Sequence, residues 1–289
     1  MLVDIVNFEA LDGIKLDGYI ARGNTPSKKI MIFVHGMQSN CFKEREKAII
    51  NKLAQVGIDS LNFNNRGSEV IKAIKSETDR SLGGMAYEDV EKCYDDIVGA
   101  INLVLGMGYE DIYLSGHSLG STKVLYTYNR FMNENSRYLE NIKALSLLSL
   151  VDIADDISKE SKEYLPLAEQ MKSEGKELEM MPINSFMHPI SVKNFLYYAY
   201  QAKDINYVQY MDPNYSYEVL NKIKIPLFMR WGDTNEMIPM PAKDLVELMQ
   251  FRVHNPYEDI NYIEGADHGY FNREQQLANE LADFLVKNG

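Results

Sequence analysis

One serine of the chain stands between two glycines, in the pentapeptide GHSLG at residues 116–120. An apolar, strand-like run at 112–115 precedes the pentapeptide, and a helical pattern begins directly after it. A strand that turns at once into a helix strains the backbone at the corner and holds the corner side chain clear of its neighbours. The corner also lies at a helix N-terminus, where free N–H groups favour developing negative charge. These features are typical of a nucleophilic Ser118.

The alternative for Ser118 is a helix N-cap, because serine is a preferred residue at that position. A bare G-x-S-x-G match would leave this alternative strong. The strand before the serine and the helix after it are the context that the nucleophile motif requires. We therefore predict that Ser118 is the nucleophile.

A serine nucleophile needs a general base, and the chain contains five histidines. His268 follows the last strand-like run and precedes the last helical pattern, so it belongs to the same carboxyl edge of the sheet as Ser118. Of the other four, two adjoin a glycine and two lie one or two residues before a proline: His35, His117, His188 and His254. His268 is the predicted base.

The imidazole of the base needs a carboxylate that fixes its tautomer. Asp233 follows a penultimate strand-like run, separated from it by one glycine, and reaches the same edge of the sheet. Asp152 is a rival acid after an earlier strand, and Asp267 adjoins the histidine but is better explained as a loop or capping residue. The predicted catalytic set is therefore Ser118, Asp233 and His268, in that chain order.

The elements that must position these residues follow from the hydrophobic pattern. Residues 3–8 and 15–21 resemble two strands joined at Asp12-Gly13, a dipeptide that closes hairpins. Short apolar runs then alternate with long helical patterns, which predicts repeated β-α units on a mostly parallel sheet with helices on both faces. The fold class is α/β with an N-terminal antiparallel hairpin.

The alternation fails between residues 152 and 220, where the pattern is helical in period and shows no strand. We predict a helical cap here, inserted into a core domain made of residues 1–151 and 221–289. Both ends of the insertion lie beside the edge that carries the predicted catalytic residues. We call residues 152–220 the cap segment.

Taken together, these motifs resemble the α/β-hydrolase superfamily over nearly the whole chain. The resemblance is carried by GHSLG at 116–120, His35-Gly36-Met37, Asn64-Asn65-Arg66-Gly67, Gly232-Asp233 and Asp267-His268-Gly269. It implies an α/β-hydrolase fold and an oxyanion hole formed by the backbone N–H groups of Met37 and Leu119. It also implies that the 64–67 loop is scaffolding. The cap segment is similar to capped microbial esterase-like proteins, near the feruloyl and siderophore esterase branches.

The cap segment is rich in flat and adaptable apolar side chains. Seven tyrosines and five methionines lie between residues 164 and 215. They could line a pocket for an aromatic or extended acyl group, or they could form the segment's own small core. The candidates for pocket residues are His35, Phe186 and Tyr197.

Composition excludes several classes of protein. The net charge of −12 disfavours binding to nucleic acid or anionic membranes, and no apolar run is long enough to span a bilayer. The N-terminus lacks the basic region of a signal peptide. Cys41 and Cys93 are too few for a disulfide framework, and neither has metal-ligand spacing. We expect a cytoplasmic protein, monomeric or homodimeric, with no metal and no cofactor.

The leading hypothesis is a serine hydrolase that cleaves carboxylic esters of small, aromatic or apolar acyl groups. Thioester or small-amide hydrolysis and acyl transfer would use the same residues. A second class is a binding protein that keeps the fold without turnover, because fold alone does not establish activity. Dehalogenase and epoxide hydrolase chemistry is excluded, since both need a carboxylate where this chain has Ser118.

Overall fold

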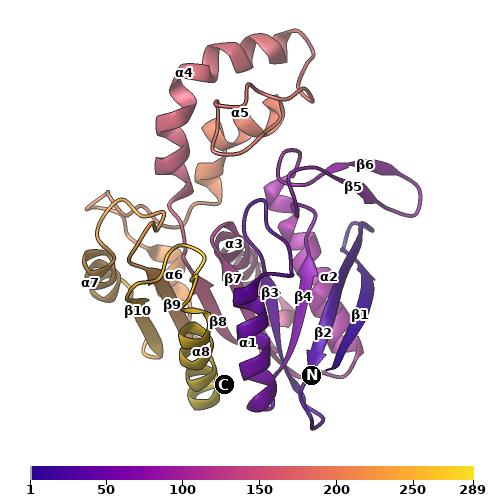
Figure 1. Ribbon diagram of the computed structural model, residues 1–289, viewed down its shortest axis with the longest axis vertical. Coiled ribbons are helices and arrows are strands. Elements are labelled where there is room, and N and C mark those ends of the chain that lie inside the picture. Colours follow the sequence, from indigo (N-terminus) through magenta and orange to yellow (C-terminus); the bar gives the residue numbers. More distant parts are fainter. Residues whose placement is uncertain (1) are drawn as a thin grey trace.

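The computed structural model describes residues 2–289, and it describes the side chains of 3–153 and 162–289. Eight strands form one sheet in the order β1-β2-β4-β3-β7-β8-β9-β10 (Figure 1). The strands are β1 (Leu2–Glu9), β2 (Lys15–Arg22), β3 (Lys29–Val34), β4 (Asp59–Asn64), β7 (Asp111–His117), β8 (Ile142–Leu148), β9 (Leu227–Gly232) and β10 (Glu258–Ile263). Strand β2 is antiparallel to both β1 and β4, and the pairs from β4 to β10 are parallel.

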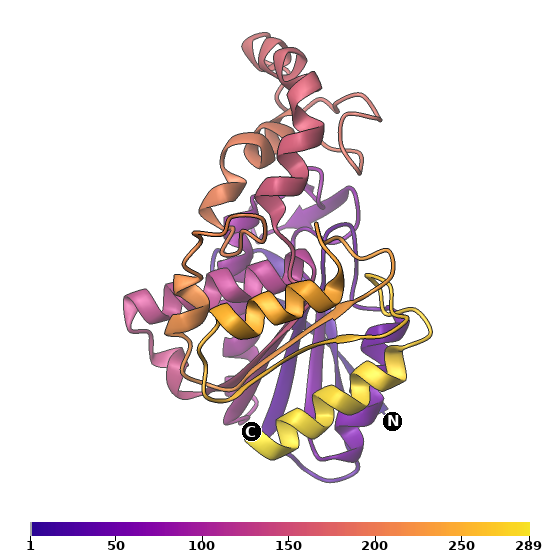
Figure 2. The ribbon, with the colours of Figure 1, turned by 90° about the vertical axis from the view of Figure 1, so that its left-hand side faces the viewer.

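Helices cover both faces of the sheet, as the alternating pattern predicted. They are α1 (Glu44–Gln55), α2 (Cys93–Gly106), α3 (Leu119–Glu134), α7 (Ala242–Arg252) and α8 (Glu274–Asn288). Met31 and Phe33 of β3 pack toward α1 and α8, whereas the alternate residues Ile30 and Ile32 pack toward α2, α3 and α7. Figure 2 shows α1 and α8 on one side of the strands and α3 on the other.

The cap segment rises above the carboxyl ends of the parallel strands (Figure 1) and is less helical than its pattern predicted. It contains α4 (Ile153–Ser173), α5 (Val192–Tyr200), a 3-10 turn (Ala202–Asp204) and α6 (Glu218–Lys222). Between α4 and α5 the chain is irregular, with one bridge between Met180 and Ser191. Apolar residues of α4 and α5 form a separate cluster that also contains Leu119. The division into core and cap domains stays a prediction.

A two-stranded hairpin, β5 (Lys72–Lys75) with β6 (Arg80–Gly83), stands apart from the main sheet. Its strands are short and rich in charge, so no apolar alternation revealed them in the sequence. Helix α2 begins at Cys93, directly after a 3-10 turn (Val90–Lys92). A second 3-10 turn (Arg137–Glu140) leads into β8. In the described part of the chain, no helix combines the length and apolar composition needed to cross a bilayer.

A buried ion pair lies beneath the start of α3. The ammonium of Lys123 contacts the carboxylate of Glu88, and each side chain is only 1% exposed. The Lys123 ammonium also donates to the side-chain oxygen of Asn65, 3.4 Å away. Burial raises the pKa of Glu88, and the attraction of Lys123 opposes that rise. Each charge therefore depends on the other for compensation.

We expect Lys123→Met to lower the free energy of unfolding by about 3 to 5 kcal/mol, because it leaves the Glu88 carboxylate buried without its cation. The double variant Lys123→Met/Glu88→Leu removes both charges and should recover most of that loss. Urea unfolding at neutral pH measures both values. Equal stability of the single and double variants would contradict this account.

Candidate active site

Ser118 occupies the corner between β7 and α3 with φ 55° and ψ −127°, a left-handed backbone that residues other than glycine rarely adopt. Its N–H donates to the carbonyl of Leu148 at 2.8 Å, which ties the corner to β8. The serine is 8% exposed and lines a cavity at the carboxyl edge of the sheet. A strained residue held at a cavity wall is the geometry expected of a nucleophile elbow.

Glycines let three chain segments meet at this corner. A Cβ on Gly120 would lie 2.0 Å from the carbonyl oxygen of Val34, and one on Gly116 would lie 2.3 Å from that of Gly120. A Cβ on Gly36 would meet the carbonyl of His117 at 2.9 Å. Any side chain at these positions would push β3, β7 and α3 apart, so the glycines are required for the close approach.

Two backbone N–H groups lie beside the serine. Leu119 is the first residue of α3, so its N–H has no acceptor within the helix. Met37 follows Gly36, where an added Cβ would lie 3.0 Å from the Cβ of Ser118. Both residues line the same cavity as Ser118. They are therefore placed where donors for an oxyanion would be needed, and that role stays a prediction.

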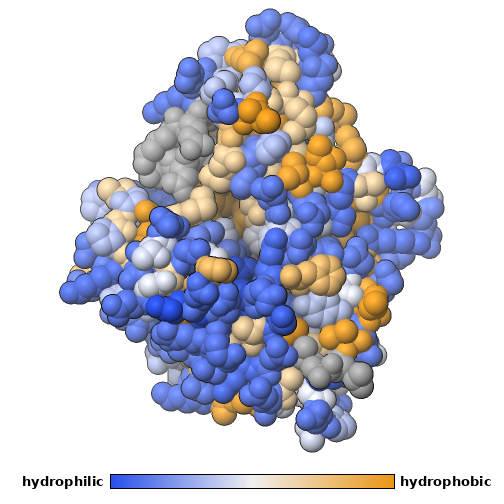
Figure 3. All heavy atoms as spheres, viewed as in Figure 1, coloured by the Kyte–Doolittle hydropathy of each residue, from blue (hydrophilic) through white to orange (hydrophobic). Residues whose placement is uncertain are grey.

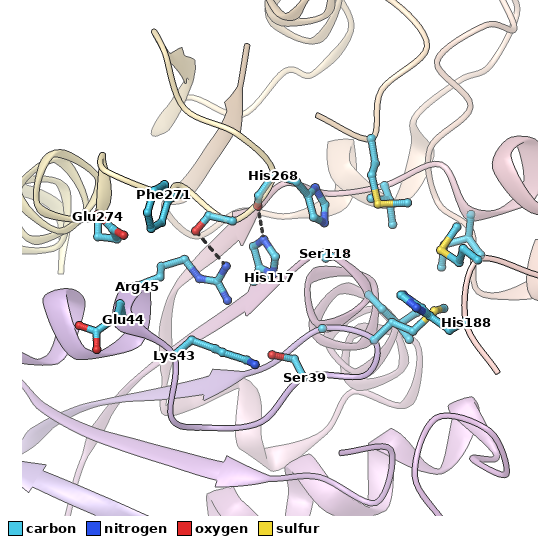
Figure 4. Close-up of a pocket in the computed structure, with 18 residues that line it drawn as sticks. Ser39, Lys43, Glu44, Arg45, His117, Ser118, His188, His268, Phe271 and Glu274 are labelled. Carbon is cyan, nitrogen blue, oxygen red and sulfur yellow. Dashed lines mark hydrogen bonds between the residues drawn. The ribbon is translucent and has the colours of Figure 1, made fainter. Parts of the chain in front are cut away.

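His268 lines the cavity with Ser118, on the loop after β10. His117, the elbow residue before Ser118, fixes this loop: its Nε2 lies 2.7 Å from the His268 carbonyl, and the two rings are 4.8 Å apart. Burial, aided by the positive charge of Arg45, lowers the pKa of His117 well below its usual value. A neutral His117 can then donate through Nε2, so the loop stays attached to the elbow (Figure 4).

The acid that contacts His268 is Glu236. Its Oε1 is hydrogen-bonded to Nδ1 of the imidazole, and its side chain is 2% exposed. Its Oε2 accepts from the Ser149 hydroxyl and the Gly232 N–H, each at 2.8 Å. Burial is the largest influence on the carboxylate and acts to raise its pKa, but the bonds from His268, Gly232 and Ser149 together lower the pKa below its ordinary value. Glu236 is therefore ionised at neutral pH.

The prediction that Asp233 orients the histidine was wrong. Asp233 is exposed and accepts from the Gly265 N–H at 2.7 Å, so it braces the neighbouring loop. The chain then turns through Asn235, with φ 48°, and directs the following glutamate inward. The sequence offered one signal for this: Glu236 is a second carboxylate in the same loop, followed directly by the apolar pair Met237-Ile238.

The rival aspartates have other partners. Asp152 accepts from the Asn206 amide at 2.8 Å and from the Tyr210 N–H at 3.1 Å, at the base of the cap segment. Asp267 accepts from N–H groups of its own loop, at Gly269 and Phe271. Its interpretation as a loop residue is confirmed.

The cavity holds about 370 Å³. Its polar centre is formed by Ser118 and His268 (Figure 4). Besides Met37 and Leu119, it has an apolar wall from the segment after β8, the start of α4 and two loops: Val151, Ile153, Met187 and Met237. This volume suits a small or medium-sized organic group. On the molecular surface, apolar and polar residues alternate around the junction of cap segment and sheet (Figure 3).

The three side chains predicted to line the pocket lie elsewhere. His35 is buried behind the elbow, where Nδ1 contacts the Gly36 carbonyl at 2.9 Å and Nε2 accepts from the Asn65 N–H; burial lowers its pKa to about 3. Phe186 stacks on Tyr198 inside the cap cluster, with 5.5 Å between ring centroids. Tyr197 lines a separate surface groove and donates to Glu91. Their neighbours Met187 and His188 line the cavity instead.

The 64–67 loop is scaffolding, as its resemblance implied. The Arg66 guanidinium binds the carboxylates of Asp96 and Asp12, with Nε 2.9 Å from Asp96 Oδ1. The Asn65 side chain accepts from the Gly67 N–H at 2.9 Å. Within the described side chains, no group of three or more His, Cys, Asp or Glu residues could hold a metal ion. The expectation of a cofactor-free protein stays a prediction.

No protein-family model matches this sequence, and no curated protein matches it significantly. Solved structures match over almost the whole chain. Est1E from Butyrivibrio proteoclasticus with bound ferulic acid aligns with 97% of this chain and 98% of its own, at 17% identity and a TM-score of 0.65.

The α/β hydrolase GrgF from Penicillium sp. sh18 aligns with 100% of this chain and 99% of its own, at 15% identity and a TM-score of 0.70. The Pyrococcus furiosus esterase Pf2001 aligns with 100% and 92%, at 18% identity and a TM-score of 0.62. The likeness shows that this chain has the α/β-hydrolase fold, which confirms the predicted fold class.

The contact between Glu236 and His268 predicts unequal effects of two acid-to-amide changes. Glu236→Gln should lower kcat for an activated ester by about 10⁴-fold, because the amide cannot stabilise the imidazolium and can hold the wrong tautomer. Asp233→Asn changes a carboxylate that braces a loop, so it should cost less than about tenfold. Steady-state hydrolysis of p-nitrophenyl acetate measures both. The opposite ranking would return the acid to Asp233.

Proposed function

We propose that this protein is a cytoplasmic serine hydrolase that cleaves carboxylic esters without a cofactor. One observation supports the proposal above all: a strained Ser118, His268, Met37 and Leu119 line one cavity, and His268 is hydrogen-bonded to the buried Glu236. Each group suits one requirement of acyl transfer: a nucleophile, an oriented base and donors for an oxyanion.

The proposed reaction begins when Nε2 of His268 takes the Ser118 proton and the serine oxygen attacks the ester carbonyl carbon. The N–H groups of Met37 and Leu119 stabilise the oxyanion that forms. His268 then gives the proton to the leaving alcohol, and an acyl-serine remains. Water, deprotonated by His268, attacks the acyl-serine, and the acid and free serine are released.

Glu236 supplies the charge that this cycle needs at His268. The imidazolium that forms at each proton transfer lies against a carboxylate whose pKa is already lowered, so the carboxylate stays ionised throughout. Because the pKa of Glu236 is lowered in the folded protein, the stabilisation by its ionised carboxylate is fully present at pH values above the ordinary carboxyl pKa. It is lost as the pH falls through the lowered value.

The lining of the cavity favours substrates whose acyl or alcohol groups are small and flexible. Its apolar side chains are aliphatic residues and methionines together with Phe271, and the cap tyrosines suggested by the sequence are not among its described lining residues. Methionine adapts to differently shaped ligands. We therefore propose short and medium aliphatic esters as the preferred class.

Ser118→Ala should lower kcat for p-nitrophenyl esters by about 10⁴ to 10⁶-fold, as removal of a catalytic serine does elsewhere, and should abolish labelling by a fluorophosphonate. Ser121→Ala is the matched control. Its hydroxyl donates to the carbonyls of Gly116 and Leu148 and lies outside the cavity lining. That variant should still be labelled, with a stability loss of about 1 kcal/mol. Labelling of Ser118→Ala at the native rate would refute the proposal.

Two adjacent cap residues test which side chains select the substrate. Met187→Ala enlarges the cavity and should shift kcat/KM between p-nitrophenyl hexanoate and acetate toward the longer ester by about 1 to 3 kcal/mol. Phe186→Ala removes a ring that lies inside the cap cluster. It should lower the melting temperature and leave the preference unchanged. Selectivity that responds to Phe186 and not to Met187 would place the pocket elsewhere.

A further inference from the structure

The cavity has two unlike sides. Val151, Ile153 and Met237 form an apolar wall below the cap segment, whereas Ser39, Lys43 and Arg45 lie at the opposite side, where the chain enters α1. Figure 4 shows Lys43 and Arg45 on one side of Ser118 and His188 of the cap segment on the other. A substrate whose ester group reaches Ser118 would therefore extend an apolar part toward the cap segment and another part toward α1.

Most charges on the α1 side already have partners. The Arg45 guanidinium is paired with the buried Glu46 at 2.7 Å, and the Glu44 carboxylate is paired with Lys47 at 3.1 Å. Lys43 differs, because its ammonium forms no ion pair or hydrogen bond with any side chain that the structure describes. In a chain of net charge −12, Lys43 is an exposed cation that lines the cavity, and the neighbouring carboxylate of Glu44 is already paired with Lys47.

The surroundings of Lys43 also favour an anion. Lys43 is the N-cap residue of α1 and gives the helix no side-chain cap, so the first N–H groups of this twelve-residue helix carry partial positive charge, which Glu44 and Glu46 in the first turn offset in part. In Figure 4 the lysine is directed toward Ser39, whose hydroxyl is a donor. Glu274 is the remaining carboxylate of the lining, and the figure places it beside Phe271, away from Ser39.

We propose that the substrate of this hydrolase carries a carboxylate, which the Lys43 ammonium and the Ser39 hydroxyl bind while the ester carbonyl lies at Ser118. This proposal rests on the proposed function and names its substrate class: a half-ester of a dicarboxylic acid, or an ester of a hydroxy acid. A monoanion fits better than a phosphate dianion, since one unpaired cation faces a cavity that Glu274 also lines.

Two matched pairs of esters test the proposal and locate the carboxylate. Phenyl hydrogen glutarate and phenyl glutaramate differ only by a carboxylate or amide on the acyl side. The alcohol-side pair is 4-acetoxybenzoate and 4-acetoxybenzamide. The measured quantity is the ratio of kcat/KM for the carboxylate to that for the amide, so effects common to both members cancel. We expect a ratio above about 10 for one pair, falling with added salt.

Lys43→Met should lower that ratio at least fivefold, and Lys43→Glu should invert it. Lys52→Met is the matched control, because Lys52 lies at the other end of α1 and outside the cavity lining. Its ratio should equal that of the native protein. A native ratio near 1 for both pairs, or a ratio that Lys43→Met leaves unchanged, would overturn the proposal.

Binding separates this proposal from the hydrolase proposal. In the Ser118→Ala background the same four esters are titrated by calorimetry, with and without Lys43→Met. Tighter binding of a carboxylate than of its amide, lost with Lys43→Met, supports the carboxylate site even if no ester is hydrolysed. Equal binding of carboxylate and amide overturns it. Absence of turnover and of fluorophosphonate labelling in the native protein contradicts only the hydrolase.

Discussion

The close approach of β3, β7 and α3 at the nucleophile elbow is the contact on which the site depends. Gly120 lies so near the carbonyl of Val34 that no Cβ fits, and only this proximity lets the strand turn into the helix within one residue. The strained φ of Ser118 follows from it. Strands β3 and β7 are each paired with a parallel strand on both sides, so the hydrogen bonds of the sheet offset the conformational free energy of the strained residue.

The histidine and its acid depend on that corner as well. His117 of the elbow binds the carbonyl of His268, so His268 is attached to the residue next to Ser118. Glu236 is fixed from two further strands, through Ser149 after β8 and Gly232 at the end of β9. The geometry of the proposed site thus depends on three neighbouring parallel strands, β7, β8 and β9.

The sequence predicted the parts of the structure that local pattern determines. The alternation of strands and helices, the elbow at Ser118 and the placement of His268 in the cavity all followed from strand-turn-helix patterns. The acid did not follow, because two carboxylates share one loop and a left-handed Asn235 decides which turns inward. The prediction of the pocket side chains was also wrong. Phe186 and Met187 are adjacent in an irregular loop, yet Phe186 is buried in the cap segment and Met187 lines the cavity, and the sequence pattern does not predict which way each points.

Backbone strain is concentrated where the chemistry would occur. Ser118, Ser149 and Tyr270 all have positive φ, and the Tyr270 hydroxyl is 3.0 Å from the Ser149 hydroxyl that binds Glu236. Such conformations persist only where the surrounding structure over-determines them. Here the hydroxyl of Tyr270 also binds the carbonyl of Arg230, at 2.7 Å, so the strained residues are bonded to the sheet and to one another. The hydrogen bonds around these strained residues therefore fix Glu236, His268 and Ser118 relative to one another, although the three residues lie on separate segments of the chain.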